Sequence, residues 1–163
     1  MNDIDRSPAR TSAGIAIIAG GFAIAVVSSP ATTVVGGVGV LFLLLGVVRG
    51  WRRAVTIGAF VLFLGVVYAG LQNAAAEELL LATAGTIIAW DVGEQSINVG
   101  QQLGRSARTA RAELVHAASS TIIGVVTIGL GFVVYTLATG GQPVTALVIL
   151  LAAVIALVAA VRD

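Results

Sequence analysis

Six long stretches without an acidic residue or an arginine dominate this chain of 163 residues. Hydrophobic residues make up 58% of the sequence and charged residues only 10%, whereas an ordinary soluble domain carries about 25% charged residues. A soluble domain of this size buries only about 70% of the surface that its unfolded chain exposes. Such a domain cannot hide this much apolar surface. The pattern therefore predicts an integral membrane protein whose first partner is the lipid bilayer.

Two further counts exclude other classes of protein. The chain has no cysteine, which excludes a secreted module held together by disulfides. Its formal net charge is +1, which gives no field for nucleic acid, so we expect no nucleic-acid partner.

The stretches predict helices, because they are apolar all round and do not alternate like the strands of a membrane barrel. The expected fold class is all-α: a polytopic membrane bundle of six transmembrane helices. The fourth stretch reaches spanning length only if it begins near Ala74, with Glu77 and Glu78 in the interface. The six stretches cover residues 12–28, 33–48, 54–71, 79–90, 114–138 and 144–161.

This reading divides the chain into four parts: a tail at 1–11, transmembrane helices one to four at 12–90, a helical arm at 91–113, and transmembrane helices five and six at 114–163. An alternative for the first stretch is a cleaved signal peptide, with basic residues before it and small residues at 29–31 after it. Pro30 argues against cleavage there.

All nine basic residues are arginines, and threading six helices places every one of them on the same side. Arginine is enriched in cytoplasmic loops, so we expect the cell membrane, with both termini and the arm in the cytoplasm. Glu77 and Glu78 then lie outside. The arginines are Arg6, Arg10, Arg49, Arg52, Arg53, Arg105, Arg108, Arg111 and Arg162.

The 91–113 arm is predicted to continue from the fourth helix. Apolar residues recur on one face of this arm, and Gly93, Gly100 and Gly104 follow another stripe. Each glycine costs a helix about 1 kcal/mol relative to alanine, so a freely solvated arm makes little sense. We expect the arm to be docked against a cytoplasmic partner or against its own bundle.

No catalytic, cofactor-binding or metal-binding residue is predicted, and no cofactor. Asp91 and Glu94 lie one helical turn apart, with His116 on the same side of the membrane, but the sequence separation gives no reason for the histidine to meet them. We expect both carboxylates to pair with arginines of the arm. Glycine pairs at 37–39 and 129–131 lack the context of a phosphate loop and indicate close helix packing.

Small residues four apart predict further close helix contacts, either within the chain or between subunits. No charged residue lies in the middle of any stretch, and this disfavours an ion-coupled carrier. Nothing in the sequence supports an enzyme. The small-residue pairs and triplet are Ala16 and Gly20, Gly65 and Ala69, and Ala152, Ala156 and Ala160.

Four segments of the carboxy-terminal half, 89–95, 100–105, 111–117 and 140–147, resemble a family of small uncharacterised multi-pass membrane proteins of halophilic archaea. The resemblance carries no functional residues. It implies a membrane assembly, because some relatives are encoded near an ATPase of the MoxR type and its partner proteins.

The sequence thus leaves two functions open. The leading one is a non-enzymatic component of a membrane assembly that presents the 91–113 arm to a cytoplasmic partner or to its own bundle. Other partners are further copies of the chain or other membrane proteins. The alternative is a pore or carrier for a small solute.

Overall fold

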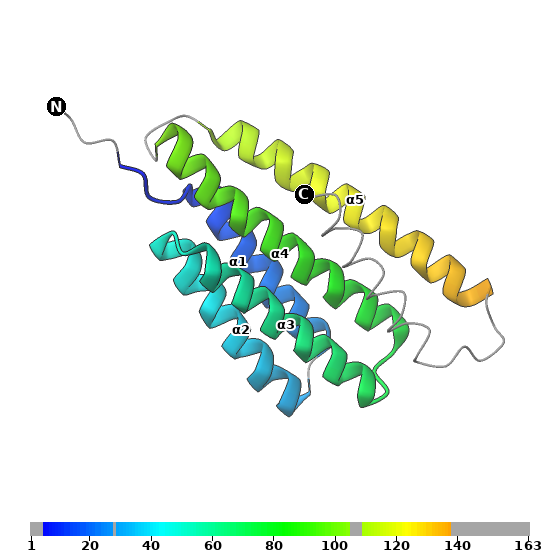
Figure 1. Ribbon diagram of the computed structural model, residues 1–163. Coiled ribbons are helices and arrows are strands. Elements are labelled where there is room, and N and C mark those ends of the chain that lie inside the picture. The colour runs from blue at the N-terminus through cyan, green and yellow to red at the C-terminus, as the bar shows by residue number, and fades with distance from the viewer. Residues whose placement is uncertain (1–4, 28, 105–108, 138–163) are drawn as a thin grey trace.

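The computed structural model describes residues 5–27, 29–104 and 109–137, and these residues fold into helices joined by short turns. The expected all-α class is confirmed. This part of the chain contains five helices, and Figure 1 labels them. They are α1 (Arg10–Val26), α2 (Pro30–Arg49), α3 (Arg52–Leu71), α4 (Ala76–Leu103) and α5 (Ala110–Leu137).

Local sequence explains where several helices begin and end. Ser29 caps α2, since its hydroxyl accepts the Thr32 amide and the Thr32 hydroxyl accepts the Ser29 amide. Pro30 follows at the first helical position, where a missing N–H costs nothing. Gly50 ends α2 in the left-handed region, with φ of 71°, a conformation that glycine adopts without strain.

Helices α1 to α4 form the packed core, and small residues bring their backbones together. A Cβ added to Gly39 would lie 2.9 Å from the Gly58 carbonyl oxygen, and one added to Gly58 would lie 2.6 Å from the Leu43 amide nitrogen. No side chain fits at either position. Leu43 is itself fully buried in this core. The close packing expected for the glycine pair at 37–39 is therefore observed at Gly39, between α2 and α3, whereas Gly37 has no neighbour within 4 Å in the described part of the chain.

The other predicted small-residue contacts divide into two groups. Ala16, Gly20 and Ala69 are buried inside the core, which favours internal packing for these positions. Gly129 on α5 has no neighbour within 4 Å in the described part of the chain, so the close packing predicted for it is not found there. The triplet at 152–160 lies outside the described residues.

Helix α5 lies along α4 and covers little of the core (Figure 1). It runs antiparallel to α4, since Gly124 faces Ile88 and Gly131 faces Leu80. Only Glu113 and Ala117 are buried on this 28-residue helix.

Three of the described helices, α2, α3 and α5, are long and apolar enough to cross a membrane. Helix α1 is apolar but has 17 residues, and α4 is not among the three. These helices support a membrane location. They do not support the expected six spanning helices, and the sixth expected stretch, 144–161, lies outside the described residues.

The arm layout is not supported either. Helix α4 runs without a break from Ala76 to Leu103, so no boundary falls at residue 91. Its carboxy-terminal half is part of the bundle, because Val92, Ile97 and Gly100 are buried. Helix α5 then begins at Ala110, four residues before the expected start. The physical reason is that small and apolar residues continue along one face of α4 beyond Trp90.

Charge separates the two ends of the bundle. The start of α1, the α2–α3 turn, the end of α4 and the start of α5 lie together at one end of the bundle, which we call the arginine end (Figure 1). Packing of Gly50 on Pro8 ties two of these segments together. The glutamate end carries Glu77 and Glu78, and neither of them is buried. The described arginines at the arginine end are Arg6, Arg10, Arg49, Arg52, Arg53 and Arg111.

Candidate functional site

Polar contacts gather on the carboxy-terminal half of α4, residues 91–101, next to the arginine end. We call this segment the polar half of α4. It meets α3 on one side, α5 on another, and the chain before α1 on a third. Each meeting involves different side chains.

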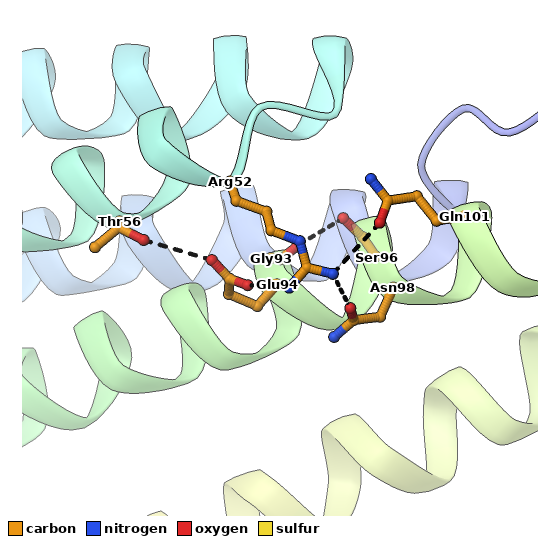
Figure 2. A network of polar contacts seen from close by, with 7 residues as sticks. All are labelled: Arg52, Thr56, Gly93, Glu94, Ser96, Asn98 and Gln101. Atoms are coloured by element: carbon orange, nitrogen blue, oxygen red, sulfur yellow. Dashed lines mark hydrogen bonds and ion pairs between the residues drawn. The ribbon is translucent and has the colours of Figure 1, made fainter. Parts of the chain in front are cut away.

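The contact with α3 is a network centred on Arg52, which Figure 2 shows. The Arg52 Nη1 lies 3.2 Å from the Glu94 Oε2, in an ion pair. The Arg52 Nη2 donates to the Asn98 side-chain oxygen and, at 3.4 Å, to that of Gln101. Thr56 donates to the other Glu94 oxygen at 3.4 Å. One guanidinium thus holds two turns of α4 against the start of α3.

This network corrects one expectation. We expected Glu94 to pair with arginines of the arm, but its ion pair is with Arg52, the first residue of α3. The reason is tertiary. Helix α3 starts beside the polar half of α4, and this places the Arg52 side chain within reach of Glu94.

The contact with α5 is centred on Asp91. The Asp91 Oδ2 lies 3.0 Å from the His116 Nε2 and accepts a hydrogen bond of 2.5 Å from the Ser120 hydroxyl. His116 and Ser120 are four residues apart and therefore share one face of α5. All three side chains are partly exposed along the α4–α5 seam.

The meeting of Asp91 and His116 is also a correction, because the sequence reading did not bring them together. Gly104, at φ of 77°, ends α4 before the chain turns back into α5. Asp91 lies 13 residues before Gly104 (104 − 91), and His116 lies 12 residues after it (116 − 104). Near-equal distances from one turn place two residues at the same level of a helical hairpin. That symmetry is a sequence signal that could have found the pair.

Beside the polar half of α4, a contact between α5 and α1 is centred on Glu113, which is 3% exposed. Its Oε2 accepts hydrogen bonds of 2.8 Å from both the amide and the hydroxyl of Ser12. Its Oε1 accepts one of 2.7 Å from Thr109. Ser12 is the third residue of α1, a helix with no side-chain cap of its own. Glu113 therefore caps α1 from α5, where a carboxylate also opposes the positive end of the helix dipole.

The chain before α1 crosses the polar half of α4 at the same end. The Ala9 amide donates to the Ser96 carbonyl oxygen at 2.8 Å. A Cβ added to Gly100 would overlap the Ser7 carbonyl, and one added to Gly93 would lie 3.0 Å from a Val55 methyl group. The prediction that the glycines of 91–104 lie in close contact is confirmed for these two. They touch the chain itself.

The chemistry of the Asp91 contact is limited by its geometry. A nucleophilic triad needs a hydrogen bond from the serine to the histidine. Here the carboxylate stands between them and bonds to both. The arrangement can hold or pass a proton between a carboxylate and an imidazole, but it does not activate Ser120. Residues 5–27, 29–104 and 109–137 contain no group of three or more His, Cys, Asp or Glu placed to hold a metal ion.

Comparison with known proteins adds one finding. A family model described as a family of unknown function (DUF7519) matches residues 6–158. This match includes both halves of the chain, whereas the resemblance in the sequence rested on the carboxy-terminal half. No curated protein and no solved structure matches the chain.

Proposed function

The chain belongs to the DUF7519 family, whose function is unknown, and from this premise we propose that it is a non-enzymatic component of a membrane assembly. In this proposal it is a multi-pass protein of the cell membrane in halophilic archaea. The arginine end faces the cytoplasm and contacts the partner. The opposite, glutamate end faces outward.

The orientation is supported by the distribution of charge. The arginines in the described part of the chain gather at one end, and Glu77 and Glu78 lie at the other. Arginine is enriched on the cytoplasmic side of membrane proteins. Both termini of the chain belong to the cytoplasmic side in this proposal.

A matched pair of glutamines tests the orientation. The native chain has no cysteine, so single cysteines can be placed at Gln72 and Gln101, which are both exposed. In intact cells an impermeant thiol reagent should label the cysteine at 72. The one at 101 should react only after the membrane is opened. Labelling at 101 in intact cells would reverse the orientation.

One observation carries the proposal of a partner. The polar half of α4 is held in place on three sides, yet its last turn presents Gln101, Gln102 and Leu103 on the surface, and Leu103 is 59% exposed. In this proposal the exposed leucine forms the apolar centre of the partner contact, and the glutamines and arginines around it form the polar rim. In this proposal the arginine end contacts the cytoplasmic partner, which the sequence analysis had expected of the 91–113 arm.

The test is purification of the tagged chain from its native membrane in a mild detergent. Leu103→Glu should remove a co-purifying protein that the unchanged chain retains. Leu71→Glu is the matched control, since Leu71 is also well exposed but lies at the glutamate end. Equal retention by all three proteins, or equal loss in both variants, would contradict the proposal.

The second candidate, a carrier for a small solute, gains support from Asp91. Asp91 lies seven residues (98 − 91) before Asn98, which accepts a hydrogen bond from Arg52. Seven residues span about 10 Å along a helix, so Asp91 lies about that far from the Arg52 network. An ionisable pair inside a spanning bundle is typical of transport pathways. The sequence named both Asp91 and His116, but their separation in the chain gave no reason to expect them to meet.

A flux assay separates the two candidates. If the chain is a carrier, proteoliposomes should take up a solute, and Asp91→Asn should abolish uptake. Glu77→Gln, which removes an exposed carboxylate at the other end, should leave uptake intact. Absence of flux over a panel of small neutral and charged solutes would leave the assembly component as the function.

A further inference from the structure

The glutamate end contains a hollow that neither candidate function uses. It has a volume of about 270 Å³ and lies between the α1–α2 turn and the α3–α4 turn. Apolar side chains of Val26, Val27, Ala69 and Ala74 line one part of it. Its polar lining is Ser29, Gln72, Asn73 and Glu78.

The α3–α4 turn shapes the polar rim. Asn73 adopts the left-handed region, with φ of 63°, a conformation that asparagine tolerates better than most residues. The Ala74 amide then bonds back to the Ala69 carbonyl oxygen at 3.1 Å. Gln72 and Asn73 of this turn line the hollow together with Glu78, which lies in the first turn of α4.

The rim offers acceptors that the described part of the chain leaves unused. Within residues 5–27, 29–104 and 109–137, no hydrogen bond or ion pair involves the side chains of Gln72, Asn73 or Glu78. Ser29 differs, because its hydroxyl is engaged with Thr32. The hollow thus combines one carboxylate, two carboxamides and an apolar wall.

We propose that this hollow binds a small primary ammonium, with its N–H groups on Glu78, Gln72 and Asn73 and its alkyl part against the apolar wall. A primary ammonium has three N–H donors, which equals the number of side chains that offer unused acceptor oxygens. The negative charge of Glu78 is complementary to the positive charge of an ammonium. The described arginines, which would repel a cation, lie at the opposite end of the bundle.

The volume of the hollow and the acceptor groups that line it restrict the class of ligand. Pockets for drug-sized molecules have volumes of about 300–1,000 Å³, so the occupant is smaller than these. A divalent cation such as Ca²⁺ needs six to eight oxygen ligands, and the apolar wall provides none. A quaternary ammonium has no N–H group for the carboxamides. An alkylammonium of a few carbons satisfies both the rim and the wall.

The probe is n-butylammonium, titrated into the purified full chain in detergent, with the side-chain amide signals of Gln72 and Asn73 followed by NMR. We expect saturable shifts for the unchanged chain. Glu78→Gln should weaken binding about tenfold to a hundredfold, the range for loss of a charged hydrogen-bond partner. Glu77→Gln is the matched control. It removes the neighbouring carboxylate, which does not line the hollow, and should bind like the unchanged chain.

Three results would overturn the proposal: no saturable shift, equal weakening by both variants, or equal binding of tetramethylammonium. The ammonium could come from a free amine or from an ethanolamine headgroup of a lipid. Nanodiscs with and without phosphatidylethanolamine distinguish these sources. Competition by that lipid identifies the headgroup as the occupant, and undiminished butylammonium binding identifies a free amine.

Discussion

Helices α4 and α5 have the same length, 28 residues, but opposite relations to the rest of the protein. Helix α5 is apolar enough to cross a membrane, yet it buries only Glu113 and Ala117. Helix α4 does not meet that criterion, yet it packs against α1, α2, α3 and α5. It buries ten residues: Ala82, Ala84, Gly85, Thr86, Ala89, Val92, Gly93, Ser96, Ile97 and Gly100.

The comparison teaches that apolarity does not decide burial in a chain of this composition. Lipid tails are as apolar as leucine, so a large aliphatic side chain gains little by leaving them for the protein. Small residues gain close backbone contact, and polar groups gain partners that lipid cannot offer. Both helices carry small residues, but α4 has charged and amide side chains along its second half, whereas the charged side chains of α5 lie only near its start.

The strongest way to break this comparison is to fill a glycine of α4. A Cβ on Gly93 would meet side chains of Val55, Val47 and Ala16, which come from three different helices. We expect Gly93→Leu to cost about 3 kcal/mol of folding free energy through overpacking and to reduce the yield of monodisperse protein. Gly129→Leu on α5, which meets nothing in the described chain, should leave the chromatographic profile unchanged.

Truncating one isoleucine on each helix should give the next largest difference. Ile97 on α4 is fully buried and Ile122 on α5 is 64% exposed. Ile97→Ala should cost about 3 kcal/mol or slightly less, because it leaves a cavity. Ile122→Ala should change stability by less than about 0.5 kcal/mol. Thermal unfolding in one detergent compares the two, and similar losses would mean that α5 is as tightly packed as α4.

We expect a substitution in the polar start of α5 to destabilise the fold, as the substitutions in α4 do. Glu113→Ala removes the acceptor for the Ser12 amide and hydroxyl, and a buried donor left without a partner costs about 2 kcal/mol. Glu113→Gln keeps one carbonyl acceptor and should lose less. The same unfolding measurement applies, with Glu77→Ala as the exposed control. No change in Glu113→Ala would show that this cap contributes nothing.

The smallest effect concerns the α4–α5 seam. Asp91→Ala removes both hydrogen bonds to His116 and Ser120, which should cost about 1 kcal/mol because the site is partly exposed. Hydrogen exchange should rise in residues 110–120 and stay constant in residues 76–90. Asp91→Asn keeps an acceptor oxygen and should restore part of the protection. A uniform rise along both helices would point to a general loss of packing.

Much of this protein can be read from its sequence. Long uncharged stretches predict apolar helices because their backbone must bond internally in lipid, and four of the five described helices lie close to their predicted ranges. Pro30 and the Gly50 turn mark boundaries through local chemistry. The alternating charge clusters predict two opposite ends, and the described arginines follow that pattern. These features depend on residues that are neighbours in the chain.

Tertiary structure decided the partners of the charged side chains. Glu94 and Asp91 could each reach several groups, and helix packing selected Arg52 and His116. The buried position of Glu113, 101 residues from Ser12 in the chain, carries no local signal at all. The physical reason is that hydrophobic pattern fixes which face of a helix is apolar. Contacts between helices then depend on crossing, register and close approach, which emerge only when all the helices pack together.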